Sequence, residues 1–579
     1  MFMLVIVTSI FVTLLNTIVP KIVGFTIDSV LGQQPPSATF AAVIDIFGGL
    51  DRIKRDIWIV AVAVIVIALV TFIFHYLRHF LTVRANEIFV KRVRDECFTH
   101  LQRLPLSWHG EHRTGDIIQR CTSDVDTISN FVTNQLLGLF RIVLLLVLSV
   151  VFMFTINVRL AAIAVSFIPV IVGYSVVYYF YIFKRVKTCD EQEGVLSAIA
   201  QENLTGVRVV RAFGKERFEQ TKFDKQNKYY TNLWVNVERT MAIFWTSSDL
   251  ILALQLLVIV TVGTVYCVHG QLTAGSLVAF ISYNMMMQGP VRMLGRIISN
   301  LSKAGVSLTR IAEIMNAEEE QYGEYEAVSG DIVFDNVSFE YEQGKRVLEG
   351  ISFSVKEGST VGIIGSTGSG KSTVAYLLDR LYDPTEGTIT VGGKSITEIP
   401  RAAIRKNMGL ILQESYIYSR SISENIGGAV DGATLDDIRS VAKTACIDDN
   451  IMSFASGYDT IVGERGVTLS GGQRQRVAIA RTLLRRTPYV IFDDSLSAVD
   501  SETDASIRKN LETVKGATTF IVSHRINTVK NADQIIVFDG GRVAEIGTND
   551  ELLEKGGLYS KIYELQMALP DELKEEVNG

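Results

Sequence analysis

The most chemically distinctive stretch of this sequence is a glycine-rich segment placed between an apolar run and a helix-forming run. Its residues are Gly365, Ser366, Thr367, Gly368, Ser369, Gly370, Lys371, Ser372 and Thr373. They fit the pattern G-x-x-x-x-G-K-[ST], in which backbone N–H groups at the start of a helix cradle phosphate oxygens. The apolar residues 361–364 predict the strand before the loop, and residues 371–381 predict the helix after it. The segment therefore predicts an ATP site, with Lys371 on the β- and γ-phosphates and Ser372 on Mg²⁺.

Two consecutive aspartates, Asp493 and Asp494, end a second run that is typical of a buried strand, residues 489–492. An acidic residue at the tip of a core strand beside a phosphate loop is suited to hold Mg²⁺, directly or through water. This pattern is weak alone but becomes specific beside the phosphate loop. Asp493 is therefore predicted as a metal ligand, together with Ser372.

A third motif, Leu469 followed by Ser470, Gly471, Gly472 and Gln473, precedes a predicted helix over residues 474–485. Its two glycines expose backbone N–H groups at a helix N-terminus, which is a second anion-binding arrangement. One domain seldom needs two phosphate-binding helix starts for one nucleotide. The motif is therefore predicted to act on a nucleotide that is bound to a partner domain.

The elements that position these motifs differ sharply between the two halves of the chain. The sequence has 579 residues, of which 48% are hydrophobic, and the long apolar runs all lie before about residue 315. A helix that crosses the hydrocarbon layer needs about 20 mostly apolar residues. Six segments meet or nearly meet this length, and Gln288, Gly289, Pro290 and Arg292 interrupt the last of them. The segments are residues 2–26, 57–80, 136–156, 160–183, 241–268 and 277–297.

Charge predicts the orientation of these six helices. The connections between the second and third and between the fourth and fifth are about 55 residues each and rich in Lys and Arg, which places them in the cytoplasm. Both chain ends and the phosphate-loop domain then lie in the cytoplasm of a multi-pass cell-membrane protein. The net charge of −6 gives a nucleic-acid partner no electrostatic support. The five cysteines have no metal-binding spacing.

Five ionisable residues lie within or at the inner edge of the predicted membrane helices. Such residues usually face a bundle interior or a wet cavity, so they could form an inner gate or a substrate wall. The alternative is that they are helix-end residues whose long side chains reach the interface. That alternative is favoured for His75 and Arg78, and a function is favoured for Arg141, while Asp249 and Arg292 stay open.

Together these motifs resemble the ATP-binding cassette (ABC) transporters, specifically half-transporters of the type IV exporter fold. The resemblance covers nearly the whole chain and implies an all-α six-helix transmembrane domain followed by an α/β P-loop NTPase domain, the ABC cassette. The boundaries expected are a transmembrane domain over 1–316, a linker over 317–330, the cassette over 331–569 and an acidic tail over 570–579. The stretches 113–116 and 205–213 resemble the segments around the two coupling helices of that fold.

The resemblance also implies roles for single residues. Tyr341 would stack on adenine, and Gln413 would sense Mg²⁺ and the attacking water. Ser470, Gly471 and Gly472 would bind the γ-phosphate of the opposite ATP. His524 would be the switch histidine on the γ-phosphate of the chain's own site. Residues 497–500 resemble the loop that joins the two nucleotide sites.

One position departs from the family pattern. The usual cassette has Asp-Glu at the end of the second acidic strand, with the glutamate polarising the attacking water, whereas this chain has Asp493-Asp494. The shorter Asp494 side chain predicts slow hydrolysis, because a misplacement of about 1 Å can cost on the order of 10²-fold in rate. An intact signature beside a weak base favours one subunit of a heterodimeric bacterial multidrug-type exporter over a homodimer with two working sites.

The function expected is ATP-driven export of amphipathic or lipophilic small molecules by alternating access, with a second half-transporter as partner. An importer of exporter fold, such as a siderophore importer, and a lipid flippase are alternatives within the same fold. An ATP-gated channel or sensor is the alternative from another class.

Overall fold

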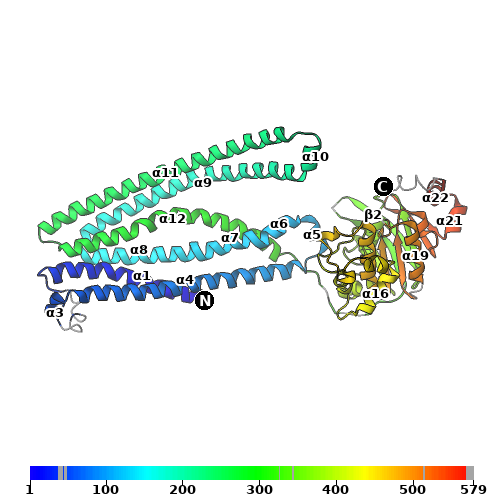
Figure 1. Ribbon diagram of the computed structural model, residues 1–579, viewed down its shortest axis with the longest axis horizontal. Helices are drawn as coiled ribbons and strands as arrows, with labels where there is room; N and C mark the ends of the chain where they lie inside the picture. Colours follow the sequence, from blue (N-terminus) through cyan, green and yellow to red (C-terminus); the bar gives the residue numbers. More distant parts are fainter. Residues whose placement is uncertain are drawn as a thin grey trace. The chain divides into compact units, whose positions relative to one another are not determined.

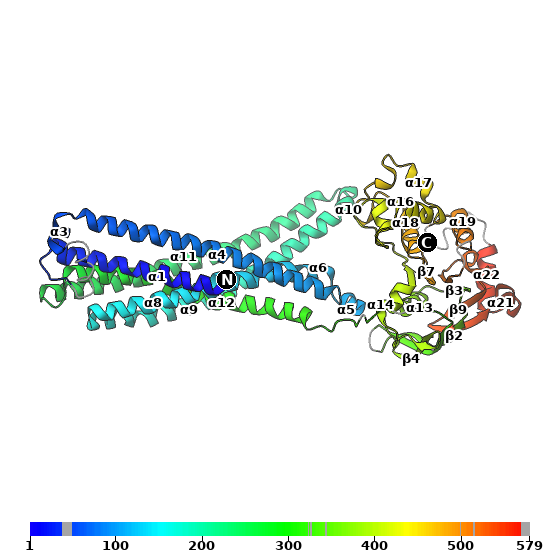
Figure 2. The ribbon, with the colours of Figure 1, turned by 90° about the horizontal axis from the view of Figure 1, so that it is seen from below.

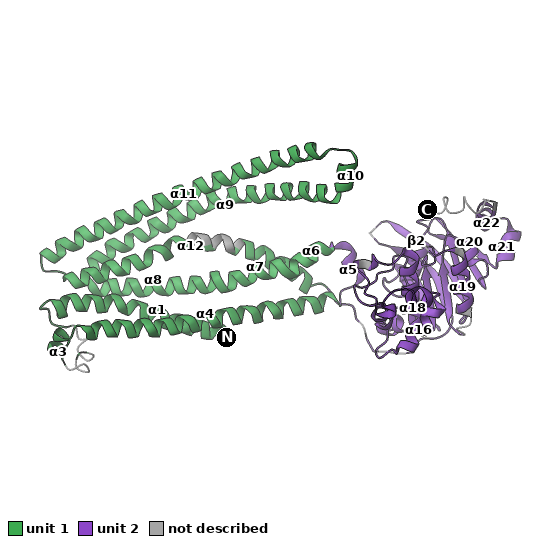
Figure 3. Ribbon diagram, viewed as in Figure 1, with its two compact units in different colours: residues 1–102, 114–317 green, residues 103–113, 318–579 purple. Residues whose placement is uncertain are grey.

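The computed structural model describes residues 1–579 apart from 37–43, 45–48, 322, 325–326, 342–343, 498, 513–515 and 569–579; the side chains of 294–296, 298–300, 302, 465, 501 and 511–512 also lie outside this description. The chain forms two compact units, which Figure 3 distinguishes by colour. The first unit comprises Met1–Gln102 and Thr114–Ala317, and the second comprises Arg103–Arg113 and Glu318–Gly579. The short segment Arg103–Arg113 therefore belongs to the same unit as the phosphate loop, although it lies within the sequence expected to form the membrane domain.

The first unit is built from long helices (Figure 1). Its α-helices are α1 (Phe2–Phe25), α3 (Leu50–Arg55), α4 (Trp58–Leu101), α6 (Thr114–Gln119), α7 (Val125–Asn130), α8 (Leu137–Ile156), α9 (Val158–Thr205), α10 (Val207–Ala212), α11 (Glu216–Val268) and α12 (Ala274–Met315). Three π-helical turns are η1 (Thr26–Leu31), η2 (Arg120–Asp124) and η3 (Phe131–Leu136). Helices α9 and α11 run side by side, and α10 connects them at one end (Figures 1 and 2).

Five helical segments within the described residues are long and apolar enough to cross a membrane: Phe2–Leu31, Trp58–Leu101, Thr114–Ile156, Val158–Thr205 and Glu216–Val268. These segments confirm a helical transmembrane domain. Helix α12 contains the sixth expected segment as one continuous helix with Pro290 inside it, but it is not among the five. A count of six crossings therefore stays a prediction.

Buried side chains join α8, α9, α11 and α12 into one core. Phe280 and Tyr283 of α12 are fully buried there, and the Tyr283 hydroxyl donates a hydrogen bond of 2.7 Å to the carbonyl of Thr17 in α1. Near the start of α12, the backbone of Gly275 approaches that of Gly24 so closely that neither glycine has room for a Cβ atom. Small residues of this kind let membrane helices pack backbone to backbone.

Two carboxylates of this bundle, Asp28 and Asp249, join neighbouring helices. Asp28 of η1 accepts hydrogen bonds from the Gly275 N–H at 2.7 Å and the Thr273 hydroxyl at 2.5 Å, which caps the start of α12. Asp249 of α11 pairs with Arg292 of α12 at 2.5 Å, so these two residues form a contact between helices.

The second unit contains the strands, in two sheets. A four-stranded antiparallel sheet has the order β2-β1-β4-β5, and a six-stranded sheet has the order β10-β9-β3-β8-β7-β6. The strands are β1 (Ile332–Glu340), β2 (Arg346–Val355), β3 (Thr360–Gly365), β4 (Glu386–Val391), β5 (Lys394–Ser395), β6 (Met408–Ile411), β7 (Tyr489–Asp493), β8 (Thr518–Val522), β9 (Gln534–Asp539) and β10 (Arg542–Gly547). Strands β3 and β7 are buried almost throughout, because helices and the second sheet cover both faces.

The helices of this unit are α5 (Leu106–Glu111), α13 (Lys371–Leu378), α14 (Arg401–Asn407), α15 (Ile422–Gly427), α16 (Leu435–Thr444), α17 (Asp448–Met452), α18 (Gly471–Leu484), α19 (Ser501–Glu512), α20 (Ile526–Val529), α21 (Asn549–Lys555) and α22 (Leu558–Ala568), with 3₁₀ turns η4 (Gly457–Asp459) and η5 (Glu464–Gly466). Several of them, including α13, α14, α18 and α20, contact strands of the six-stranded sheet, and α15 and α16 pack against α18. Alternating strands and helices around a mainly parallel sheet confirm the expected α/β architecture.

Candidate functional site

The parallel strands of the six-stranded sheet bring the predicted nucleotide residues to one edge. Ile363 of β3 and Asp493 of β7 both pair with Val522 of β8, and Ile411 of β6 pairs with Phe492 of β7. The chain leaves these strands at the same level, so the phosphate loop, Asp494, His524 and Gln413 follow the carboxyl ends of neighbouring strands. This edge is where open parallel sheets bind ligands.

The phosphate loop joins β3 directly to α13. Gly370 has a φ of 92° and caps the start of α13, a backbone conformation that glycine adopts without strain. The Lys371 ammonium donates hydrogen bonds to the carbonyls of Gly365 at 2.9 Å and Ser366 at 2.7 Å, so it lies over the loop. Burial lowers the pKa of Lys371, while Asp494 and Asp493 oppose that shift. The loop thus has a fixed cation next to its backbone N–H groups.

Asp493 and Ser372 form the oxygen pair expected of a magnesium site. The Ser372 hydroxyl donates a hydrogen bond of 2.7 Å to the fully buried Asp493 carboxylate. Burial raises the pKa of Asp493, and the hydrogen bond from Ser372 acts in the opposite direction. A hydroxyl and a carboxylate are the hard oxygen ligands that Mg²⁺ prefers, so the donor set fits that metal.

Asp494 follows β7 in a left-handed backbone conformation, with a φ of 44°. Its N–H donates to the Val522 carbonyl at 3.0 Å, and its own carbonyl accepts from the Ser497 hydroxyl at 2.7 Å. The Asp494 carboxylate lies 3.2 Å from Nδ1 of His524. The other ring nitrogen of His524, Nε2, is buried without a hydrogen-bond partner. The backbone thus holds Asp494 firmly, and the histidine keeps one nitrogen for a ligand.

Tyr341, which precedes the phosphate loop in the sequence, packs among aromatic rings. Its ring centroid is 4.8 Å from that of Phe339 and 5.1 Å from that of Tyr382, both edge-on. Its hydroxyl lies 3.2 Å from the Thr373 hydroxyl, so the ring is tied to α13, while 45% of the residue remains exposed. An exposed, oriented aromatic face beside the phosphate loop is suited to stack on a nucleobase.

Gln413 lies two residues beyond β6 and is exposed. Its carbonyl accepts a hydrogen bond of 3.4 Å from the Gln475 side chain, which belongs to α18. Through this contact the start of α18 is connected to the edge of the core sheet.

The Ser470–Gln473 motif forms the N-terminal cap of α18. The Ser470 hydroxyl accepts from the Gln473 N–H at 3.3 Å, and the Gln473 side chain accepts from the Ser470 N–H at 2.9 Å. This reciprocal arrangement is a capping box, which leaves the N–H groups of Gly471 and Gly472 to other partners. In the part of the chain that the structure describes, no hydrogen bond or ion pair joins Ser470–Gln473 to the phosphate loop. Of the 497–500 loop, Ala498 lies outside the described residues.

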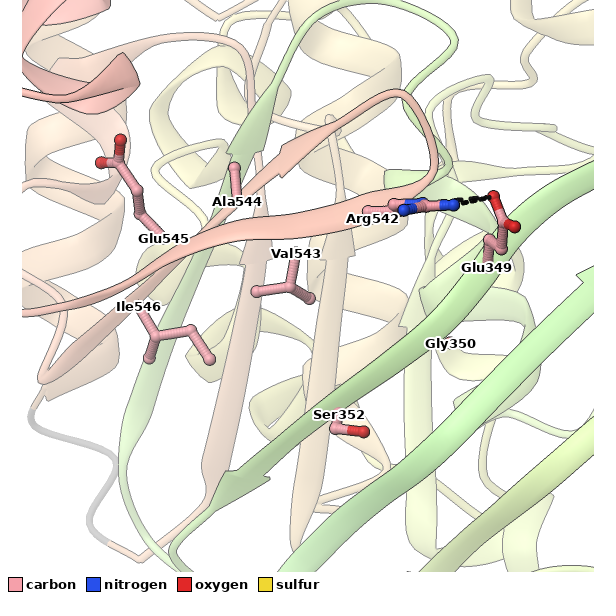
Figure 4. Close-up of a pocket in the computed structure, with 8 residues that line it drawn as sticks. All are labelled: Glu349, Gly350, Ser352, Arg542, Val543, Ala544, Glu545 and Ile546. Atoms are coloured by element: carbon pink, nitrogen blue, oxygen red, sulfur yellow. Dashed lines mark hydrogen bonds and ion pairs between the residues drawn. The ribbon is translucent and has the colours of Figure 1, made fainter.

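A separate pocket of about 580 Å³ lies between β2 and β10 (Figure 4). An ion pair of 2.9 Å between Arg542 and Glu349 crosses one end of it. None of its lining residues belongs to the predicted nucleotide site.

Glu320 has a buried carboxylate to which its sequence context assigned no role. It was assigned only to an acidic linker, yet its side chain is 4% exposed and pairs with Arg405 at 2.7 Å. Its signal was weak, because the arginine lies 85 residues away in the chain.

Comparison with known proteins agrees with this geometry. Residues 2–291 match the model of the ABC transporter transmembrane region, and residues 348–497 match the ABC transporter model. The uncharacterized ABC transporter ATP-binding protein YknU of Bacillus subtilis (strain 168) is 35% identical over 96% of this chain and 93% of its own length. The probable multidrug resistance ABC transporter ATP-binding/permease protein YheI of the same organism is 33% identical over 94% of both chains.

A more distant relative and a solved structure extend the comparison. The ATP-dependent lipid A-core flippase of Legionella pneumophila (strain Lens) is 32% identical over 82% of both chains. The solved structure of a bacterial Atm1-family ABC exporter with ATP bound has a TM-score of 0.80 and 27% identity, over 97% of this chain and 98% of that one. The chain therefore belongs to the ABC transporters, as a multi-pass membrane protein of the Atm1-family exporter fold whose cassette couples ATP hydrolysis to transport.

Proposed function

We propose that this chain is one subunit of a dimeric exporter that moves amphipathic or lipophilic small molecules out across the cell membrane by alternating access. The names of two relatives from Bacillus subtilis (strain 168), a probable multidrug resistance transporter and a putative multidrug export protein, support this substrate class. In the proposed topology α12 is the sixth crossing, and both chain ends and the cassette are cytoplasmic.

The proposed nucleotide is ATP with Mg²⁺. ATP would supply the phosphoryl group, and Mg²⁺ would supply positive charge that neutralises the phosphates. Lys371 and the N–H groups of residues 365–373 hold the β- and γ-phosphates, and Tyr341 stacks on the adenine. Ser372, Asp493 and Gln413 hold the metal, directly or through water. His524 donates to the γ-phosphate, and its position is fixed by Nδ1 against the Asp494 carboxylate at 3.2 Å.

The observation that carries the heterodimer proposal is the contrast between Asp494 and the signature. Asp494 is the base of the chain's own site, and its short side chain is directed to His524. The signature, by contrast, is intact and capped by Ser470 and Gln473. A chain with this pair of features binds its own ATP for long periods and promotes hydrolysis of the ATP held by its partner. The partner we propose is a second half-transporter with glutamate at the matching position.

A lipid flippase is the second candidate, favoured by the lipid A-core flippases of Legionella among the relatives. In that case the substrate is an amphipathic lipid, which crosses between leaflets instead of leaving the membrane. Uptake by a siderophore-type importer of the same fold is the reverse direction. An ATP-gated channel or sensor would use the same cassette without pumping.

Two measurements test this proposal. The first is the ATPase rate of the full-length chain purified without a partner, for which we expect slow turnover. Brisk hydrolysis that Asp494→Asn abolishes would contradict the weak-base, heterodimer proposal. The second is ATP-dependent accumulation of a fluorescent lipophilic dye in inside-out vesicles, which indicates export. Accumulation in right-side-out vesicles would indicate import, and a steady conductance without ATP turnover would indicate a channel.

A further inference from the structure

The linker carboxylate Glu320 is held by two arginines of α14. Arg405 donates to both oxygens of Glu320, at 2.7 and 3.0 Å, and Arg401 lies 3.6 Å from it. Only 4% of the Glu320 side chain is exposed, against 22% for Arg405 and 15% for Arg401. A two-pronged contact between a guanidinium and a carboxylate fixes orientation as well as distance.

The same two arginines hold the end of the phosphate-loop helix. Arg401 and Arg405 donate hydrogen bonds of 2.8 and 3.1 Å to the carbonyl of Arg380, which lies two residues beyond α13. Asp383 accepts from Arg380 at 2.8 Å and from Arg401 at 2.5 Å, which closes the network. Helix α13 begins at Lys371 and spans about 12 Å, so a shift at its far end reaches the phosphate loop as a rigid movement.

Glu320 is also joined to the turn after α4. Its N–H donates a hydrogen bond of 2.8 Å to the carbonyl of Arg103, and the Arg103 side chain pairs with Glu319 at 3.4 Å. Arg103 is two residues beyond α4, and Glu320 is five residues beyond α12. Two of the long helices therefore continue in sequence into one small junction, which we define as Arg103, Glu320, Arg401 and Arg405.

The junction also lies directly before a strand of the nucleotide edge. Helix α14 ends at Asn407, β6 follows at once, and β6 leads to Gln413 two residues after Ile411. A displacement of α14 would thus be passed on to Gln413 along a short, buried strand. Coupling between sites travels through packed elements and charge networks of this kind when they connect two arrangements.

From these contacts we infer that Glu320 is a positioning residue for coupled transport: it ties the continuations of α4 and α12 to the far end of the phosphate-loop helix and to the strand before Gln413. The buried ion pair is a poor stabilising device, since replacing such pairs by apolar residues is often neutral or better. Its value lies in transmission, because the two hydrogen bonds from Arg405 fix the orientation of the carboxylate as well as its distance, with Arg401 3.6 Å away. The role is distinct from binding or hydrolysing ATP.

The test uses the full-length protein, in the dimer in which it is purified, reconstituted in lipid vesicles. Spin labels are placed at Leu31 and Val268, exposed ends of η1 and α11, after the five native cysteines are replaced. The distance between labels is measured without nucleotide and after trapping with ATP and vanadate. The KM for ATP and the ATPase rate are measured on the same preparations.

For Glu320→Gln we expect the KM for ATP to stay within about twofold. The fraction of protein whose label-to-label distance changes with ATP, which we call the shift, should fall by about fivefold or more. Arg405→Lys keeps the positive charge but cannot make both hydrogen bonds to Glu320, so it should weaken the shift in the same way. It is the second variant to measure if Glu320→Gln folds poorly. Glu318→Gln is the matched control, an exposed linker glutamate two residues away, and should leave the shift unchanged.

Two results would overturn the inference. One is a full label response in Glu320→Gln and Arg405→Lys, even with a lower melting temperature, because that would leave Glu320 a purely structural contact. The other is an equal loss of ATP binding and label response, which would place the defect in the nucleotide site. A wild-type protein whose labels do not respond to ATP would refute alternating access itself, and with it the need for coupling.

Discussion

Lengthening the side chain at position 494 by one methylene should convert a slow site into a faster one. The backbone of Asp494 is fixed by its hydrogen bonds to Val522 and Ser497, so Asp494→Glu moves the carboxylate forward by about 1.5 Å, one carbon–carbon bond. A misplacement of about 1 Å costs on the order of 10²-fold in rate, or about 2.7 kcal/mol of barrier. The left-handed backbone, with a φ of 44°, would cost glutamate about 1 kcal/mol. That cost is the same in the ground and transition states, so it lowers stability and leaves the barrier unchanged.

We therefore expect Asp494→Glu to accelerate hydrolysis at this chain's own phosphate loop by about 10- to 100-fold. Single-turnover hydrolysis of radiolabelled MgATP measures this rate, and equilibrium binding of a non-hydrolysable analogue shows whether affinity has changed. Asp494→Asn is the control for charge, because it keeps the length of the side chain. If Asp494→Glu is no faster than the wild type while binding is unchanged, the aspartate already positions the water and the geometric reasoning fails.

Three further expectations follow from the structure. Ser470→Ala removes the side-chain cap of α18, which should lower the free energy of unfolding by about 1 kcal/mol in denaturant titrations. It should also slow ATP turnover in the dimer without weakening ATP binding at the chain's own phosphate loop. Burial raises the pKa of Asp379 to about 7, so the stability that its protonated form contributes is fully present below about pH 4 and is lost as the pH rises to about 7. Asp379→Asn should reduce this fall in melting temperature between about pH 4 and about pH 7. Gly275→Ala places a Cβ atom against the Gly24 carbonyl and 2.6 Å from the Asp28 carboxylate carbon, and it should destabilise the helical unit by about 1–3 kcal/mol, read from its melting temperature in detergent. Gly173→Ala, with open space around it, should not.

The sequence predicted those features whose signal is local. The phosphate loop is read directly from consecutive residues, and the buried runs before Gly365 and Asp493 predict two strands of a parallel sheet, which the structure confirms. The helical transmembrane domain is equally local, since each crossing is one continuous apolar segment. The last segment, in α12, is the exception, because its polar residues around Pro290 dilute the apolar signal.

Features that depend on distant pairing could not be predicted. Nothing near Glu320 in sequence indicates that Arg401 and Arg405 will surround it, and the acidic linker around it is typical of a solvated connection. The segment Arg103–Arg113 was expected within the membrane domain, and only its contacts assign it to the unit of the cassette. The pairing of Asp249 with Arg292 likewise joins two helices, so neither residue alone could show whether it was paired.

The Glu320 contact also bears on how the cassette can be produced by itself. A cassette that begins at residue 331, where its first strand is about to start, would lack Glu320. Arg405 would lose the carboxylate that it contacts through two hydrogen bonds, while Arg401 would keep its ion pair with Asp383. Removing one partner of a buried ion pair is destabilising, because the remaining charge stays desolvated, so the contact of α14 with the end of α13 would be weakened. Soluble fragments intended for crystallisation or inhibitor screening should therefore start before Glu320, since otherwise they would report on a cassette with a loosened phosphate-loop helix.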